Sequence, residues 1–163
     1  MKIDAVSIFP DFFDVLDISL LGKARDQGLI EFQAHDLRKW TSDKHKTVDD
    51  SPYGGGAGMV MKPEPLFECI EGLMAQRTYD AVIYTSPDGE TLNQPMANRM
   101  SAYGNVMIVC GHYKGIDQRV RDTLITHEIS IGDYVLTSGV LPALVITDAI
   151  VHDLTHTGNV KTL

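Results

Sequence analysis

Short runs of apolar and β-branched residues alternate along the chain with segments of helical spacing. Each run is short enough for a buried strand, and the runs cover residues 3–9, 29–35, 81–85, 105–110 and 126–131. Apolar stripes with helical spacing lie between and after them: at Leu66, Ile70, Leu73 and Met74, at Val120 and Leu124, and over residues 141–153 as a final buried helix. This alternation predicts an α/β fold with a parallel sheet flanked by helices.

Glycine- or proline-bearing loops follow three of the predicted strands, at residues 86–89, 111–115 and 132–139. Ligands of open α/β sheets bind beyond the carboxyl ends of the strands, so we expect these loops to form one composite site. Another segment, residues 36–61, shows no clear periodicity and has four glycines within residues 54–58. It does not fit G-x-x-x-x-G-K-[ST], so a nucleotide phosphate loop is a poor interpretation. A flexible surface loop and a ligand-contacting loop both stay open.

Charge narrows the kind of nucleic-acid contact that is conceivable. The 163 residues carry 14 Lys and Arg against 22 Asp and Glu, a formal net charge of −8, which excludes binding through overall positive charge. A local basic cluster is either a solvated face or a phosphate-contact patch, and comprises Arg38, Lys39, Lys44, His45 and Lys46. The carboxylates that follow, Asp49 and Asp50, could accept hydrogen bonds from a base edge or act as a general base.

Cysteine content and the chain start bear on location. Cys69 and Cys110 lie in apolar runs without metal-ligand spacing, which favours two small buried side chains over a disulfide framework. The N-terminus lacks a signal-peptide core, and no window holds the ~20 apolar residues of a membrane span. We therefore expect a single domain in the cytoplasm, with no membrane contact.

Two of the loops carry side chains or backbone groups suited to a ligand. In residues 110–117, Gly111 and Gly115 allow a tight turn, Tyr113 offers a stacking surface, and Asp117 is a candidate helix N-cap. Residues 131–136 are either plain edge structure or a stretch whose backbone groups pair with a flat ring such as adenine.

The order of these motifs resembles that of the bacterial tRNA (guanine-N1)-methyltransferases, the TrmD family of the SPOUT superfamily. The matching strings span about residues 1 to 151, and are Ile8-Phe9-Pro10, Asp36-Leu37-Arg38, residues 44–59, 85–89, 110–117 and 130–136, and Leu141-Pro142-Ala143.

The resemblance implies a C-terminal trefoil knot, a rare exception to unknotted topology, whose loops hold S-adenosylmethionine. The residues implied in cofactor binding are Tyr84, Thr85, Ser86, Pro87, Gly111, Tyr113, Ile131, Gly132, Asp133, Tyr134, Val135, Leu136, Gly139 and Pro142. Those implied in RNA binding are Lys44, His45, Lys46, Asp50 and Lys114. The family transfers a methyl group to N1 of the guanine 3′ of the tRNA anticodon and works as a homodimer. Magnesium is compatible with this chemistry, although no metal-ligand spacing supports it.

The sequence departs from the family pattern near its end. His152 occupies the position of the family's catalytic Arg, and the family's catalytic Asp is absent. We therefore expect a methyltransferase domain over residues 1–151 and an atypical tail over residues 152–163, where the family continues into a linker and a tRNA-binding domain. Ser138, Val140 and Lys114 also differ from the usual Gly, Glu and Glu. Two alternatives follow: a dimerising S-adenosylmethionine-binding module with little turnover, and a SPOUT RNA methyltransferase with another target.

Overall fold

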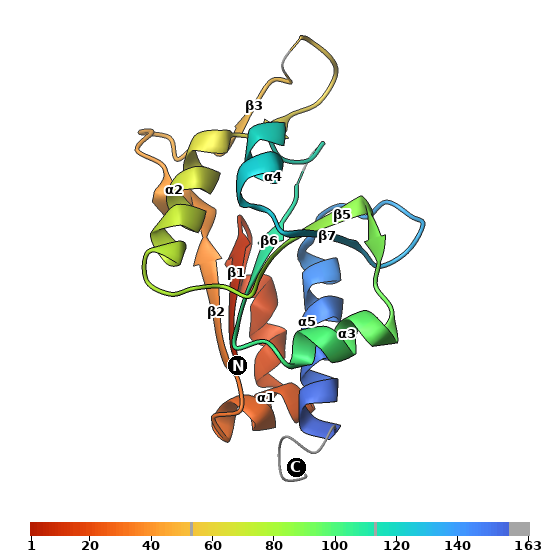
Figure 1. Ribbon diagram of the computed structural model, residues 1–163. Helices are drawn as coiled ribbons and strands as arrows, with labels where there is room; N and C mark the ends of the chain where they lie inside the picture. The colour runs from red at the N-terminus through yellow and green to blue at the C-terminus, as the bar shows by residue number, and fades with distance from the viewer. Residues whose placement is uncertain (53, 113, 157–163) are drawn as a thin grey trace.

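The computed structural model describes residues 1–52, 54–112 and 114–156. Its centre is a five-stranded parallel sheet in the order β2-β1-β6-β5-β7 (Figure 1). The strands are β1 (Lys2–Ser7), β2 (Glu31–Asp36), β5 (Ala81–Thr91), β6 (Asn105–Cys110) and β7 (His127–Ser130). The parallel α/β architecture predicted from the apolar runs is confirmed, and each run overlaps one of these strands. The trefoil knot stays a prediction of the resemblance.

Helices cover both faces of the sheet (Figure 1). One face carries the 3₁₀ helix η1 (Pro10–Asp17), α1 (Ser19–Asp26), α3 (Gln94–Ser101) and α5 (Val140–His156). The other carries η2 (Leu37–Trp40), α2 (Pro63–Met74) and α4 (Gln118–Leu124). The sheet is therefore the middle of three layers, because strand residues alternate between two separate cores.

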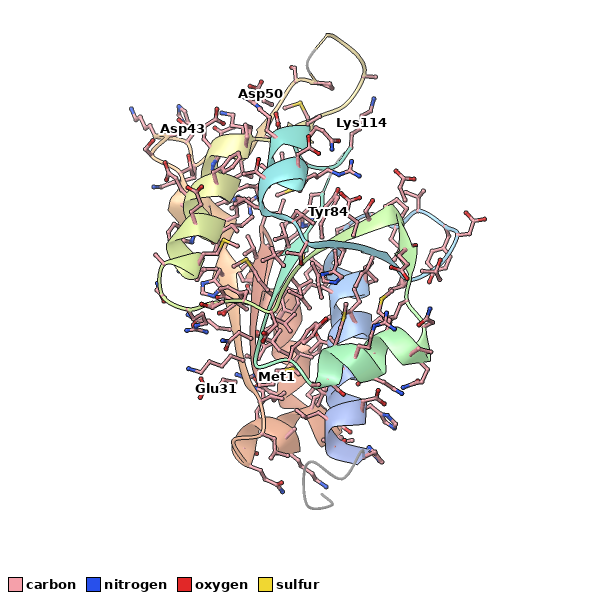
Figure 2. The ribbon with its side chains drawn as sticks, viewed as in Figure 1. Met1, Glu31, Asp43, Asp50, Tyr84 and Lys114 are labelled. Atoms are coloured by element: carbon pink, nitrogen blue, oxygen red, sulfur yellow. The ribbon has the colours of Figure 1, made fainter. Side chains whose placement is uncertain are left out.

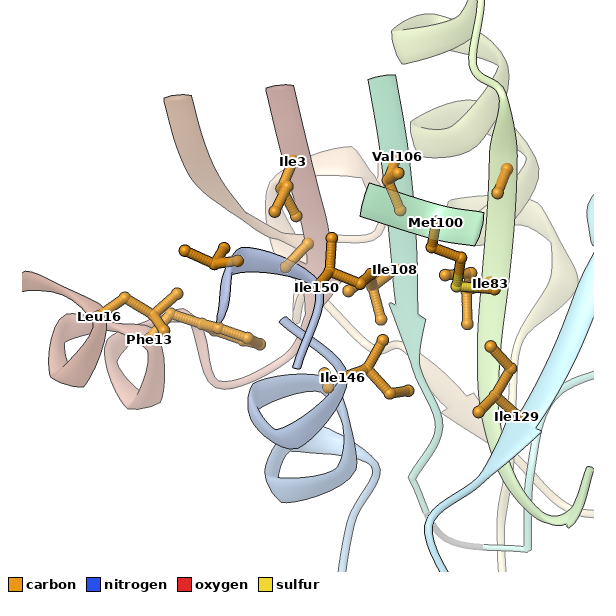
Figure 3. Packing of buried hydrophobic residues seen from close by; sticks show 14 of the residues in the cluster. Ile3, Phe13, Leu16, Ile83, Met100, Val106, Ile108, Ile129, Ile146 and Ile150 are labelled. Carbon is orange, nitrogen blue, oxygen red and sulfur yellow. The ribbon is translucent and has the colours of Figure 1, made fainter. Parts of the chain in front are cut away.

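The core beneath α5 joins both ends of the chain. Phe13 and Leu16 of η1 pack in one cluster with Ile146 and Ile150 of α5, against strand residues such as Ile108 (Figure 3). All five side chains are at most 3% exposed. Burial of this extent stabilises the layer by about 1.5–3 kcal/mol for each large apolar side chain.

The final helix is buried on one face only. α5 starts at Val140 and runs through His156, so residues 152–156 of the expected tail are helical, and residues 157–163 lie outside the described part. Leu141 and Val145 on its outer face are 50% and 45% exposed. The prediction of a final buried helix over residues 141–153 is thus confirmed for the face that packs on the sheet, while its outer face is exposed.

Strand β5 is longer than the apolar run predicts. Its pairing with β7 is interrupted between Thr85 and Glu90, both of which face Ile129, so residues 86–89 bulge from the sheet. Gly89 allows the chain to return, because a Cβ there would lie 2.5 Å from the Glu128 carbonyl carbon. The predicted loop is therefore a break inside a strand.

The segment over residues 36–61 contains three short elements that periodicity did not reveal: η2, β3 (Asp49–Asp50) and β4 (Val60–Met61). Asp36 caps η2 by accepting a hydrogen bond from the Arg38 amide at 3.0 Å. β3 and β4 pair antiparallel, and the glycines of residues 54–58 connect them. Three residues of this segment, Leu37, Val48 and Met61, pack in one core cluster with residues of α2.

No helix within the described ranges is long and apolar enough to cross a membrane.

Candidate functional site

A cavity of about 480 Å³ lies beyond the carboxyl ends of β5, β6 and β7. Its walls are the break in β5, the loop after β6, the loop after β7 and the start of α5. The lining residues are Tyr84, Thr85, Ser86, Pro87, Asp88, Gly111, His112, Lys114, Gly115, Arg121, Ile129, Ser130, Ile131, Gly132, Tyr134, Val135, Leu136, Thr137, Ser138, Gly139 and Pro142. The three loops singled out in the sequence thus meet around one hollow.

Three loops touch at one point beneath this cavity. The Thr85 hydroxyl donates to the Gly139 carbonyl at 3.1 Å, and the Gly139 amide donates to the Gly111 carbonyl at 2.7 Å. A Cβ at Gly139 would lie 2.0 Å from Thr85 Oγ1 and 2.7 Å from the Gly111 nitrogen. Only glycine therefore permits this crossing.

The ring of Tyr84 forms the floor under the loop after β6. Tyr84 is 4% exposed, and a Cβ at Gly111 would meet its Cε2 at 2.8 Å, while one at Gly115 would meet its hydroxyl at 3.1 Å. Both glycines leave room for the ring. Burial raises the pKa of the Tyr84 hydroxyl, so the ring stays neutral.

All but two of the predicted cofactor residues line the cavity. Asp133 is exposed in the same loop and is not part of the lining, and Tyr113 lies outside the described residues. The lining also includes residues that the sequence analysis did not assign to the cofactor, notably Asp88, His112 and Arg121.

His112 is the most strongly perturbed titratable group of the lining. It is 5% exposed, and its ring meets Phe9 edge to face at a centroid distance of 5.3 Å. Burial, together with the positive charge of Arg38, lowers the pKa of His112 from 6.5 to about 4. The imidazole is therefore neutral near pH 7 and can exchange hydrogen bonds without adding charge.

Arg121 is held rigidly at another wall. It donates two hydrogen bonds to the Glu128 carboxylate, at 2.7 and 2.6 Å, and its guanidinium carbon lies 5.6 Å from the Tyr84 ring centroid. Its hydrogen bonds to Glu128 raise the pKa of Arg121 and lower that of Glu128. No sequence signal predicted this pair, because its partners come from α4 and β7.

A second cavity, of about 740 Å³, adjoins the first and shares Lys114 as a wall. It lies between β3, β4 and the starts of α2 and α4, and Asp50 lines it. Two of the predicted RNA-contacting residues, Asp50 and Lys114, thus lie at one hollow. Asp117, which lines it too, caps α4 by accepting from the Arg119 amide, as predicted.

The other three predicted RNA-contacting residues, Lys44, His45 and Lys46, are exposed on one turn. Asp43 organises it by accepting from the amides of His45 and Thr47 at 3.2 and 3.1 Å, and its hydrogen bonds, led by that of Thr47, lower the pKa of Asp43 to about 2. Lys44 therefore projects from a constrained turn, and the exposed Lys46 donates from Nζ to the Thr41 carbonyl at 3.2 Å.

Arg38 differs from its neighbours in the basic cluster. Its guanidinium donates to the Ile8 carbonyl and lies over the Phe9 ring at 5.7 Å. The Arg38 guanidinium therefore makes its contacts inside the fold. The cluster is thus divided into structural and exposed members.

His152 lies far from this edge of the sheet. It is twelve residues beyond Val140, which is about 18 Å along an α-helix, and α5 leads away from the cavity (Figure 1). Its ring stacks on that of His156 at a centroid distance of 4.2 Å. Within one chain, His152, which the resemblance places at the family's catalytic Arg position, therefore does not reach the cavity.

Metal coordination finds no support in the part of the chain that the structure describes, where no three His, Cys, Asp or Glu side chains are grouped to hold an ion.

Both cysteines are free and buried, as expected, and burial raises the pKa of Cys69 to about 12.

Fold and site together define an α/β protein with a ligand cavity built by three strand-end loops. The family model described as tRNA (Guanine-1)-methyltransferase TrmD matches residues 1–160, and the chain belongs to this family. Among the relatives is the tRNA (guanine-N(1)-)-methyltransferase of Flavobacterium psychrophilum, 56% identical over 152 residues, which are 93% of this chain and 68% of the relative.

Other relatives bear the same name. The enzyme of Chlorobium chlorochromatii is 55% identical to this chain, over 93% of this chain and 66% of the relative. The enzyme of Porphyromonas gingivalis is 54% identical, over 92% of this chain and 67% of the relative. The chain therefore spans about two thirds of the length of the curated relatives it matches.

Proposed function

We propose that this chain transfers the methyl group of S-adenosylmethionine to N1 of the guanine 3′ of the anticodon in tRNA. The observation that carries the proposal is the meeting of three loops around one cavity in a chain of this family. Its 480 Å³ falls within the range of small-molecule sites, about 300–1,000 Å³.

The chemistry of the cavity wall fits an adenosine joined to a short amino acid. Pro87, Ile131 and Pro142 offer apolar surfaces for a flat ring, and Asp88 brings a carboxylate that suits a cationic ligand. The glycine crossing at Gly139 lets the ligand approach the backbone closely.

When bound, S-adenosylmethionine supplies a methyl group already activated on a sulfonium, so the protein's main task is alignment. Thr85 and Gly111, joined through the Thr85 hydroxyl and the Gly111 amide at 3.4 Å, hold the cavity floor in one geometry. The buried Tyr84 ring keeps water from that floor. Methyl transfer then requires the guanine N1 to lie in line with the methyl group and to lose its proton.

We propose that tRNA approaches from the side of Lys114, Asp50 and the exposed turn with Lys44 and Lys46. This side supplies cations for phosphates and a carboxylate that can accept from a base edge. The net charge of −8 makes such a local patch necessary. Because tRNA is the substrate, we place the protein in the cytoplasm.

We also propose a homodimer. Large apolar side chains are exposed at η1 and on α5, whose buried residues share one core cluster: Phe9, Phe12, Val15, Leu141 and Val145 are 44–54% exposed. Exposed apolar surface is typical of interaction sites. A dimer would also bring a second chain's residues to a cavity that His152 of the same chain does not reach.

Dimerisation is tested by sedimentation velocity of the wild type and of Val145→Asp. We expect a dimer for the wild type and a monomer for the variant, since a buried unpaired charge is costly. Met74→Asp, at an exposed apolar position on the opposite face, is the control and should stay dimeric. A monomeric wild type would refute this part of the proposal.

A second candidate is an S-adenosylmethionine-binding module with little turnover, favoured by the histidine at the family's Arg position. Calorimetry with S-adenosylmethionine tests what both share, and absence of binding at millimolar ligand would refute both. Methyl transfer to tRNA transcripts with and without a guanine after the anticodon separates them. Activity that persists without that guanine would instead favour an RNA methyltransferase with another target.

A further inference from the structure

We propose that Lys114 is a positioning residue that fastens the glycine-rich loop, residues 54–58, to the cofactor cavity. The inference rests on the proposed function and adds a regulation to it: cofactor affinity and the conformation of that loop depend on each other. The aliphatic stem of Lys114, rather than its charge, makes the connection.

Backbone hydrogen bonds bring the two segments together. The Lys114 amide donates to the Met59 carbonyl at 3.1 Å, and the Met61 amide donates to the Gly115 carbonyl at 3.1 Å. Met61 and Ile116 form a parallel bridge one residue further on. The end of the glycine-rich loop is thus paired with the loop after β6 that lines the cofactor cavity.

The Lys114 side chain adds a contact that depends on a glycine. A Cβ at Gly58 would lie 2.8 Å from Lys114 Cε and 3.2 Å from Cδ. The stem therefore lies directly over Gly58, while the exposed ammonium remains in water. Figure 2 places Lys114 between the loop that connects β3 to β4 and Tyr84 on the cavity floor.

Lys114 also lines both cavities, so its side chain is part of the wall that separates them. A shift of this side chain changes the cofactor cavity on one side and the hollow beside Asp50 on the other. Because the neighbouring Gly115 and Gly111 leave room only for the Tyr84 ring, movement of either glycine also disturbs the cavity floor. A movement of Lys114 therefore changes the shape of both cavities.

The decisive experiment is a double-mutant cycle on the full chain. S-adenosylmethionine affinity is measured by calorimetry for wild type, Gly58→Ala, Lys114→Ala and the double variant. We expect Gly58→Ala to weaken binding about threefold in the wild-type background, because the new Cβ displaces the exposed Lys114 stem at low cost. It should have no further effect in Lys114→Ala, because contacting residues are coupled. Strain from the φ of +101° at Gly58 is present in both backgrounds and cancels.

Two controls separate the stem from other causes. Lys114→Met keeps an unbranched stem without the charge, and in this background Gly58→Ala should keep its full effect on cofactor affinity. Gly55→Ala also places a Cβ at positive φ, +79°, but into open space. It should leave cofactor affinity within about twofold of wild type.

An equal effect of Gly58→Ala in both backgrounds, or no effect in either, would overturn the inference. If the wild type binds no S-adenosylmethionine, the proposed function fails, and the tether is still tested by amide hydrogen exchange at Met61 and Lys114. Gly58→Ala should then accelerate exchange at both amides, Gly55→Ala should not, and Lys114→Ala should abolish the difference. Unchanged exchange in Gly58→Ala would refute the tether on its own.

Discussion

Gly139→Ala tests whether the crossing of three loops holds the cofactor site together. The new Cβ would lie 2.0 Å from Thr85 Oγ1 and 2.7 Å from the Gly111 nitrogen, distances that no side chain tolerates without movement. Thr85 and Gly111 belong to different strand ends, so neither can yield alone. The substitution must therefore displace at least two walls of the cavity.

The magnitude follows from overpacking and from lost hydrogen bonds. Overpacking a tight interior costs about 1–3 kcal/mol. The bonds from Thr85 to the Gly139 carbonyl and from the Gly139 amide to Gly111 are at risk, and each contributes about 1 kcal/mol. We expect a loss of about 2–4 kcal/mol in the free energy of unfolding, which moves the urea midpoint by about 1–2 M.

Urea unfolding and cofactor calorimetry check this together. S-adenosylmethionine affinity should fall by more than about tenfold, since alignment of the three loops defines the cavity. Gly104→Ala is the matched control, because its Cβ meets only Asp80 Oδ2 at an ordinary 3.5 Å. If both variants unfold at the same urea concentration and bind the cofactor equally, the crossing carries no energetic weight and the reasoning is refuted.

Three further predictions concern charge. Between pH 7 and pH 5, the free energy of unfolding of the wild type should fall by about 2 kcal/mol more than that of His112→Gln, as measured by urea titration. The reason is that the imidazole of the unfolded chain gains its proton near pH 6.5, whereas that of the folded chain gains it only near pH 4. Asp4→Asn should cost about 3–5 kcal/mol in urea unfolding, since the carboxylate, 2% exposed, binds Arg77 at 2.9 Å. Replacing Lys44 and Lys46 by Ala should weaken tRNA binding in filter assays and make its salt dependence shallower, by about 0.7–0.9 per lost phosphate contact.

Each of these has a contrary outcome. Parallel pH profiles for wild type and His112→Gln would contradict the buried neutral imidazole. For the second, Asp26→Asn on the exposed side of α1 is the control, and an equal cost in both variants would remove the special status of Asp4. For the third, Lys23→Ala in α1 is the control, because α1 lies at the end of the molecule opposite β3 (Figure 1). A salt slope unchanged by the Lys44 and Lys46 substitutions would indicate that the turn is only a solvated face.

The Asp4 cluster shows how the fold places charge inside a predicted strand. Asp4 accepts hydrogen bonds from Arg77 and from the Tyr79 hydroxyl, at 2.9 and 2.6 Å, and lies 2.7 Å from His35 Nε2. Burial alone would raise the pKa of Asp4, but these hydrogen bonds and the charges of His35 and Arg77 outweigh it and lower the pKa. The apolar run at residues 3–9 predicted the strand and gave no sign of its partners.

Local signals in the sequence mark the start of α3 but not the short helices η1 and α1. α3 follows Asn93, which accepts from the Met96 amide at 2.9 Å, and has Pro95 in its first turn. This is a start signal visible in the sequence. η1 and α1 are short, and Ser19 at their junction has φ +63°, so no continuous period marks them. Tertiary packing of Phe13 and Leu16, rather than propensity, stabilises them.

The sequence by itself determined the strands, the sheet type and the three loops that line the cavity, because buried parallel strands require apolar runs and their exits favour glycine or proline. It also placed Asp117 as a cap, since capping is a local interaction. Only the tertiary structure decided which groups meet: Thr85 with Gly139, Arg121 with Glu128, and the stem of Lys114 with Gly58. These contacts join residues whose proximity depends on strand order and crossover connections, and no local pattern encodes it.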